Sequence, residues 1–167
     1  MTIECQIFLA ILLPLFGLIA IVAFGRFPNI RETATLVTAT ANAINVWSLL
    51  PKVMAGERPA AKAFDILPGI ELAFLIEPLG MMFACVASGL WIVNAVYSVG
   101  YMRGNNEKNQ TQFYACFPVA ISAAVGIAFA ANLFTMFIFY EVLTLSTYPL
   151  VAHKGNEDAR RGARTYL

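Results

Sequence analysis

A single acidic residue, Glu141, lies inside an otherwise uncharged stretch that runs from Phe113 to Ala152. At about 20 apolar residues for each crossing, a stretch of this length can span a bilayer twice. A carboxylate at membrane depth costs a few kcal/mol of insertion free energy even on lenient scales, and chains keep such acids mainly for ion or proton movement. Glu141 is therefore the leading candidate site residue.

Hydroxyl groups follow this acid at helical spacing. Thr144 lies one turn beyond Glu141 and Tyr148 about two turns beyond it, so a helix places both hydroxyls on the face of the carboxylate. A cationic side chain that approaches and then leaves the acid would load and unload a proton, because it stabilises the charged form only while it is near. The alternative is that Glu141 is a protonated, hydrogen-bonded residue that only holds helices together.

The composition is that of a membrane protein. Hydrophobic residues make up 59% of the chain, charged residues only 13%, and the mean hydropathy is +0.70, whereas soluble domains carry roughly 25% charged residues. We expect an all-α integral membrane protein with a single membrane domain over residues 1–167. A net charge of +1 argues against a nucleic-acid partner. The cysteines form no metal-ligand or redox spacing and are interpreted as packing residues, so no metal or cofactor is expected; they are Cys5, Cys85 and Cys116.

Apolar runs and their breaks predict about five transmembrane helices. The expected spans are residues 7–24, 33–50, 78–101, 113–131 and 133–152. Residues 51–77 carry charges and further prolines, which indicates an extramembrane loop with room for a short hairpin. Almost no sequence separates the last two spans, so the fourth and fifth helices should form a tight antiparallel hairpin around Asn132.

The distribution of Lys and Arg predicts that the N-terminus lies outside. Cytoplasmic loops carry an excess of these residues. An outside N-terminus puts eight of them inside and three outside, the three being Lys52, Arg58 and Lys62. The eight are Arg26, Arg31, Arg103, Lys108, Lys154, Arg160, Arg161 and Arg164.

Other polar residues in or beside the spans are weaker candidates. Glu77 precedes Pro78 at the mouth of the third span, where an interfacial charge is favoured over a role in proton entry. His153, at the inner end of the fifth span, suits either a proton relay or an interfacial position without function. Interhelical hydrogen bonding is expected for Asn45, Asn94 and Asn132, with Asn94 a further candidate for contact with a water wire.

The segment FIFYEVLTLSTYPLV, residues 137–151, resembles the fifth-helix signature of the antiporter-like membrane subunits. These subunits are shared by Mrp-type cation/proton antiporters, respiratory complex I and energy-converting hydrogenases. Residues 97–102 and the small-residue stretch that ends at Leu133 agree with the resemblance. Two departures are Tyr140, where tryptophan is usual, and Pro149 within the segment that usually reads Ser-Tyr-Leu-Leu.

The resemblance implies a role for Glu141 as a proton carrier. In that family the glutamate of this motif pairs with a lysine on the seventh helix and takes part in proton translocation. The match covers only the N-terminal third of a usual member, and the seventh-helix lysine has no counterpart here. We therefore expect a fragment or one piece of a split transporter, in the inner membrane of a prokaryote, with other membrane subunits supplying the missing helices and the lysine.

Three functions follow from these observations. The leading hypothesis is a proton-translocating subunit of a multisubunit Mrp-type antiporter that exchanges Na⁺ for protons and has no catalysis of its own. The residues Ser146 to Gly155 resemble the Mrp members more, and no quinone or redox site is visible. The alternatives are a membrane-arm proton-pumping subunit of a complex I-like dehydrogenase or hydrogenase, which would make the chain a translocase subunit, and a non-conducting scaffold subunit.

Overall fold

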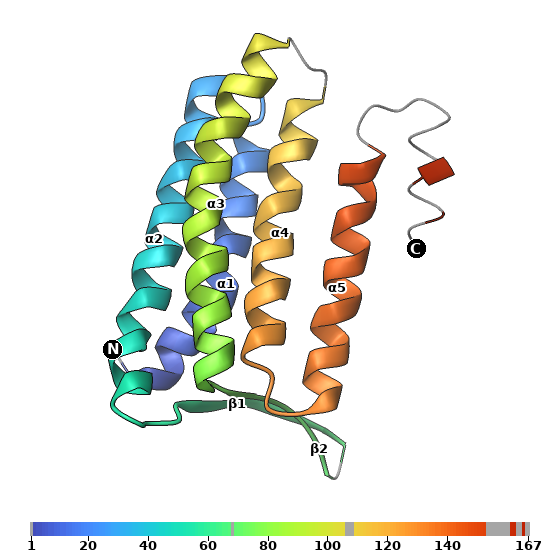
Figure 1. Cartoon of the computed structure of the whole chain (residues 1–167). Helices are drawn as coiled ribbons and strands as arrows, with labels where there is room; N and C mark the ends of the chain where they lie inside the picture. Colours follow the sequence, from blue (N-terminus) through green and yellow to red (C-terminus); the bar gives the residue numbers. More distant parts are fainter. Residues whose placement is uncertain (1, 68, 106–108, 153–160, 163–164, 166–167) are drawn as a thin grey trace.

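Five long helices run side by side in alternating directions in the part of the chain that the structure, a computed structural model, describes (Figure 1). The described residues are 2–67, 69–105, 109–152, 161–162 and 165. The helices are α1 (Ile3–Ala23), α2 (Pro28–Met54), α3 (Pro78–Gly104), α4 (Gln110–Ala128) and α5 (Leu133–Val151), with strands β1 (Ala60–Leu67) and β2 (Ile70–Leu75) between α2 and α3. The prediction of an all-α membrane fold is confirmed.

The helices begin where capping and proline chemistry allow. Thr2 caps α1 by accepting a hydrogen bond from the backbone N–H of Cys5 at 3.4 Å, and prolines stand at the first positions of α2 and α3, where the missing N–H costs nothing. The expected second span was too short at both ends. Pro51 lies inside α2, which continues to Met54.

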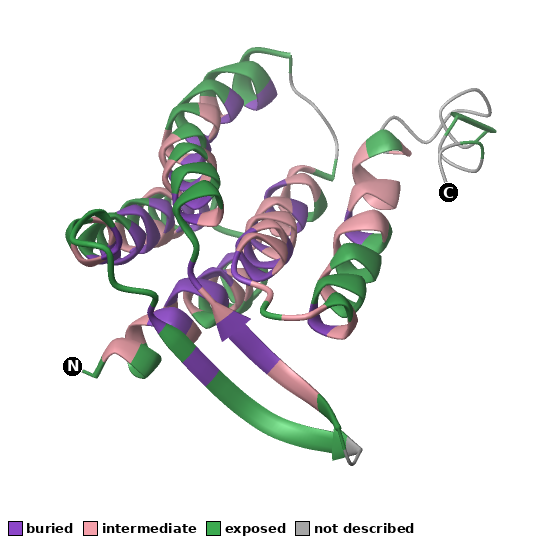
Figure 2. Cartoon of the chain, turned by 60° about the horizontal axis from the view of Figure 1, so that its bottom comes forward, coloured by how far each residue is buried: buried purple, intermediate pink, exposed green. Residues whose placement is uncertain are grey.

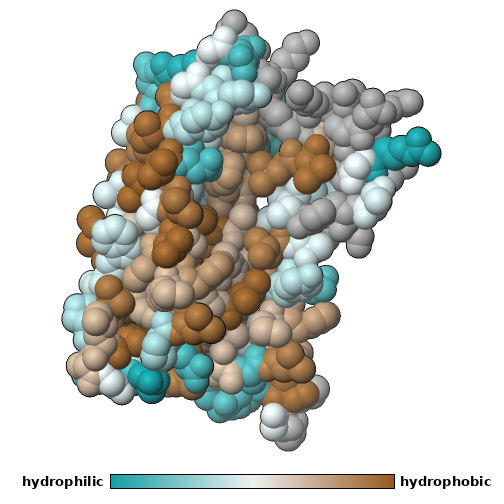
Figure 3. Space-filling view, in the orientation of Figure 1, coloured by the Kyte–Doolittle hydropathy of each residue, from teal (hydrophilic) through white to brown (hydrophobic). Residues whose placement is uncertain are grey.

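Four helices, α1, α3, α4 and α5, are long and apolar enough to cross a membrane by length and composition. Figure 3 shows brown apolar side chains over the middle of one face and teal hydrophilic ones gathered toward its two ends. The more polar α2 turns Val37, Ile44 and Trp47 outward and buries Asn42 and Asn45. A helix whose outward side chains are apolar and whose buried side chains are polar is typical of a bundle surrounded by lipid. The protein is a multi-pass membrane protein.

Helices α1 to α4 form a bundle around one main core, and Figure 2 shows their buried residues turned toward one another. Small residues let the helices approach closely. A Cβ added to Gly80 of α3 would lie 2.1 Å from the carbonyl oxygen of Ala128 in α4. The amide of Asn45 donates to the carbonyl of Gln6 at 3.0 Å, which confirms the interhelical hydrogen bond predicted for Asn45.

The expected loop holds an antiparallel hairpin that closes one end of the bundle (Figure 1). Lys62 of β1 forms ion pairs with Asp65 at 2.7 Å and Glu71 at 2.8 Å, and these hydrogen bonds raise the pKa of Lys62, Asp65 having the larger effect. Strand β2 also pairs with the short connection between α4 and α5, since Phe74 bridges Ala130. This connection makes α4 and α5 the tight antiparallel hairpin that the sequence predicts.

Candidate functional site

The hairpin fixes where α5 begins. Asn132 caps the helix by accepting from the backbone N–H of Thr135 at 2.8 Å, and its amide donates to the carbonyl of Glu71 at 2.9 Å. The fully buried hydroxyl of Thr135 accepts a hydrogen bond from the backbone N–H of Ala73 at 3.1 Å. Asn132 therefore caps a helix and ties it to β2, rather than joining two helices as the sequence suggested.

Phe139 fixes the rotation of α5 about its own axis. Its ring lies against Gly126 of α4, where an added Cβ would come within 2.3 Å of the ring. On the other side the ring meets Phe74 of β2 with centroids 5.7 Å apart. Because successive residues of a helix are rotated by about 100°, Glu141 points to the side of α5 opposite Phe139.

The structure places Glu141 on the outer face of α5, which we define as the exposed side that carries Phe137, Tyr140 and Glu141. No residue that the structure describes forms a hydrogen bond or ion pair with its carboxylate. The expectation that this acid is buried is therefore wrong for the described chain. The reason is packing, because α5 packs mainly on α4 and β2 and its buried residues are Thr135 and Ser146.

The two hydroxyl residues proposed to support Glu141 are half-buried on α5. The hydroxyl of Thr144 donates to the carbonyl of Tyr140 at 3.0 Å, so its proton is not available to the acid in this arrangement. Tyr148 lies seven residues beyond Glu141, which puts its side chain near the same face of the helix. Their predicted role beside the carboxylate stays a prediction.

Asn94 is not brought to Glu141. Asn94 is half-buried on α3, and α4 stands between α3 and α5 (Figure 1). Asn94 forms no hydrogen bond to another helix among the described residues, and its contact with a water wire stays a prediction. His153 lies outside the described residues, so its proposed relay stays a prediction.

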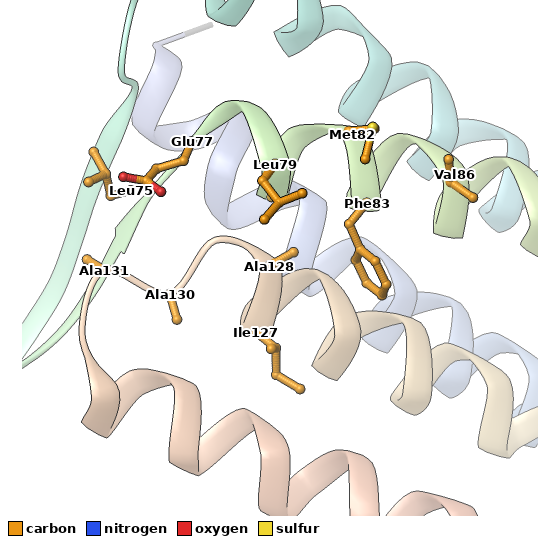
Figure 4. Close-up of a pocket in the computed structure, with 11 residues that line it drawn as sticks. Leu75, Glu77, Leu79, Met82, Phe83, Val86, Ile127, Ala128, Ala130 and Ala131 are labelled. Carbon is orange, nitrogen blue, oxygen red and sulfur yellow. The ribbon is translucent and has the colours of Figure 1, made fainter.

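Glu77 lies at the mouth of an apolar pocket of about 760 Å³, beside the start of α3 (Figure 4). Leu79 and Phe83 of α3 and Ile127 of α4 line the same pocket. Glu77 is exposed at the hairpin end of the bundle, whereas Glu141 lies about 12 Å further along α5 at 1.5 Å per residue. The two acids therefore do not form one site within the described chain.

The sequence of this chain is similar to those of known membrane subunits. The family described as NADH-Ubiquinone oxidoreductase (complex I), chain 5 N-terminus, matches residues 68–114. The NADH-quinone oxidoreductase subunit N of Desulforudis audaxviator (strain MP104C) is 30% identical over 90 residues, which are 54% of this chain. The Na(+)/H(+) antiporter subunit A1 of Staphylococcus aureus (strain bovine RF122 / ET3-1) is 23% identical over 147 residues, 86% of this chain. The predicted resemblance to the antiporter-like membrane subunits is confirmed.

The same fold occurs in a solved membrane complex. A chain of the membrane-bound sulfane sulfur reductase, an archaeal respiratory membrane complex, superimposes with a TM-score of 0.81 at 17% identity over 96% of this chain. The match takes in 33% of that chain, and the present chain spans 18% of the length of each of the two curated relatives. What it shares with them is therefore one part of a larger fold.

At the end of the bundle opposite the hairpin, the chain carries a charged cluster that the sequence did not predict. The guanidinium of Arg103 binds both carboxylate oxygens of Glu32, at 3.1 Å and 2.5 Å, and Glu32 is only 5% exposed. Arg31, only 3% exposed, lies 3.5 Å from the same carboxylate. Sequence reasoning only counted both arginines among the positive charges on the inner side, although an acid at a strongly basic end of the bundle was a signal for a buried ion pair.

Arg31 connects this cluster to the start of α4. Its guanidinium donates to Gln110 at 2.8 Å and to the hydroxyl of Thr111 at 3.1 Å, and it lies 4.8 Å from the ring centroid of Tyr114. The same guanidinium donates to the carbonyl of Gly25 just past α1 at 3.5 Å. The cluster connects all four bundle helices at one end of the bundle, whereas Glu141 lies near the middle of α5. Its role is therefore structural.

Proposed function

We propose that this chain is part of a proton-translocating subunit in a multisubunit membrane complex that exchanges monovalent cations for protons. In this proposal Glu141 is the proton carrier. The observation that carries it is the position of Glu141 at the middle of a membrane span, on a face that the described chain does not cover. The similarity to a Na(+)/H(+) antiporter subunit A1 supports the proposal.

The depth of Glu141 makes a protein cover necessary. The acid lies about 12 Å from one end of α5 and about 15 Å from the other, which is too far for its short side chain to reach water. A charged carboxylate that faced lipid would cost several kcal/mol. The outer face of α5 is therefore covered by further helices, and a cationic side chain on them, a lysine by the resemblance, exchanges the proton with Glu141.

The same relatives suggest which cation is exchanged and in which cellular membrane the chain lies. We take Na⁺ as the exchanged cation because the antiporter relative is a Na(+)/H(+) antiporter subunit. The two curated relatives come from Staphylococcus aureus and Desulforudis audaxviator, so the inner membrane of a prokaryote is the proposed location. The helices that cover α5 lie either later in a longer chain or on a partner membrane subunit.

A second candidate is a membrane-arm proton-pumping subunit of a redox-driven complex. The match of residues 68–114 to the complex I family and the 30% identity to a subunit N favour this candidate. The chemistry at Glu141 is the same in both cases. They differ in the partners, because only the redox-driven complex copurifies with flavin or iron–sulfur subunits.

The test is cation/proton exchange in inverted membrane vesicles that contain the native complex. Glu141→Gln removes the proton carrier with little change of shape, and Glu141→Asp keeps a carboxyl on a shorter arm. We expect exchange to fall to the background with Gln and to be partly retained with Asp. Glu57→Gln is the matched control, since Glu57 is an exposed acid between α2 and β1.

The outcomes separate a carrier from a scaffold. If Glu141→Gln exchanges cations as fast as the unmodified complex, Glu141 carries no proton and the chain acts as a non-conducting scaffold. The complex must be present at equal amounts in all vesicles, which is measured on solubilised membranes by the recovery of the assembled complex.

A further inference from the structure

The centre of the α1 to α4 bundle contains polar atoms without protein partners. Asn42 of α2 is fully buried, and neither atom of its side-chain amide has a hydrogen-bond partner among the described residues. Trp91 of α3 is 2% exposed, and its indole N–H has no partner there either. An unsatisfied buried polar group costs about 1–3 kcal/mol, so each of these atoms requires an explanation.

The two side chains lie at the same depth in the bundle. Trp47 of α2 donates from its indole N–H to the carbonyl of Cys85 in α3 at 3.1 Å, which sets the register of these antiparallel helices. Asn42 lies five residues before Trp47, and Trp91 lies six residues after Cys85. Because the two helices are antiparallel, Asn42 and Trp91 lie on the same side of the Trp47–Cys85 hydrogen bond along the bundle axis. At 1.5 Å per residue, Asn42 is about 7.5 Å and Trp91 about 9 Å from that bond.

Helix α1 adds an acceptor at this depth. The bond from Asn45 to the carbonyl of Gln6 sets the register of α1 and α2, and it places Ala10 opposite Asn42. Pro14 stands inside α1 four residues after Ala10. A proline has no N–H, so the carbonyl of Ala10 loses its helical donor.

Helix α4 makes the same region polar from its own side. The hydroxyl of Ser122, which is 3% exposed, donates to the carbonyl of Ile11 at 2.7 Å. Each of the four bundle helices thus directs a polar group into the middle of an otherwise apolar core. In Figure 2 the buried faces of these helices turn toward one another around this centre.

We infer that Asn42, Trp91 and the carbonyl of Ala10 bind a buried water molecule in the centre of the bundle. The polar atoms at this depth include unpartnered donors, the amide of Asn42 and the indole N–H, and the unpartnered Asn42 oxygen as an acceptor. The Ala10 carbonyl is a further acceptor, because Pro14 removes its helical donor. An anion would satisfy only the donors and a metal cation only the acceptors. Water satisfies both kinds, and buried waters typically make about three hydrogen bonds to such groups.

This site is separate from the proposed proton carrier. Phe139 and Gly126 set the register of α5 against α4. Ser122 lies four residues before Gly126 and Glu141 two residues after Phe139, which puts them within about 3 Å of the same depth. The bulk of α4 lies between them, because Glu141 points away from α4. A test of the water site therefore does not depend on whether Glu141 carries a proton.

A structure of the intact membrane complex at a resolution that shows water provides the direct test. We expect one water oxygen within about 2.7–3.2 Å of both Asn42 and the Trp91 indole nitrogen. The inference is overturned if Asn42 bonds directly to Trp91 or if no density lies between them. This measurement needs no variant, so it does not depend on whether a mutant assembles.

Thermal unfolding of the complex gives a second test through Asn42→Leu, which replaces the amide with an apolar group of similar size. If water is bound, the variant displaces it and leaves the Trp91 N–H unsatisfied, so the unfolding temperature falls. A higher unfolding temperature contradicts the inference, because removing an unsatisfied amide would then relieve a cost. Asn94→Leu is the matched control on the half-buried part of α3 and should change the temperature less.

Discussion

Arg103 at the end of α3 holds both carboxylate oxygens of Glu32 near the start of α2, at 3.1 Å and 2.5 Å. Glu32 also faces Arg31 at 3.5 Å, so two guanidinium groups share one buried carboxylate as their counter-charge. We predict that Glu32→Gln destabilises the bundle by about 3–5 kcal/mol, because it leaves buried positive charge without a partner. Thermal unfolding of the solubilised complex measures this loss.

The control for this prediction is a solvent-exposed ion pair of the same chain. Asp65 binds Lys62 with its side chain 67% exposed, so Asp65→Asn should cost less than about 1 kcal/mol. Equal losses for the two variants would show that the Glu32 cluster contributes no more than a surface pair.

Gly126 is predicted to be intolerant of a side chain because of Phe139. A Cβ at this position would lie 2.3 Å from the Phe139 ring, and overpacking of this kind costs about 1–3 kcal/mol. We expect Gly126→Ala to lower the unfolding temperature of the complex and Phe139→Leu to restore part of it. Gly100→Ala is the control, since nothing lies within 4 Å of an added Cβ there; a similar loss at both glycines would contradict the packing argument.

The number of helices and the α4–α5 hairpin could be predicted from the sequence because long apolar runs have few alternative structures. The start of α2 could not be predicted from hydropathy. Hydropathy placed Arg31 and Glu32 outside the membrane-spanning helices. They lie inside α2, and Arg103, 71 residues away from Glu32, supplies the counter-charge of this acid. Such partners depend on tertiary packing and leave no local pattern.

The surroundings of Glu141 also depend on tertiary packing and could not be predicted from the sequence. The type and spacing of Glu141, Thr144 and Tyr148 indicated chemistry on one helix, and the comparisons confirm the resemblance that suggested it. The environment of the acid was not predictable, because it depends on which helices pack against α5. In the described chain α5 packs mainly on α4 and β2, and this leaves the acid exposed.

The cap at the start of α5 should control how firmly this helix is held. Asn132→Ala removes the acceptor for the Thr135 N–H at 2.8 Å and the donor to the Glu71 carbonyl at 2.9 Å. We expect a loss of about 1 kcal/mol and faster hydrogen exchange at the first amides of α5, measured by mass spectrometry. The first amides of α1, which Thr2 caps, should exchange as before; acceleration at both helices would indicate general destabilisation instead.

The orientation of the bundle can be tested with two engineered cysteines. The hairpin and the α3–α4 connection lie at opposite ends of the bundle (Figure 1), and the positive charges predict that the hairpin is outside. In a background without native cysteines, Asp65→Cys should react with an impermeant maleimide in intact cells. Asn105→Cys, at the exposed end of α3, should react only after the membrane is opened. The reverse pattern would show that the N-terminus is inside.

The proposed function requires that protein, not lipid, covers the outer face of α5 in the assembled complex. Phe137 is 54% exposed and lies one turn before Glu141, so a spin label at Phe137→Cys reports what surrounds the acid. We expect low accessibility to dissolved oxygen in the complex, because packed helices exclude the gas more than lipid chains do. The same label on the isolated chain in lipid provides the uncovered reference. Equal accessibility in complex and isolated chain would leave Glu141 facing lipid, where a carboxylate has no cation with which to exchange a proton.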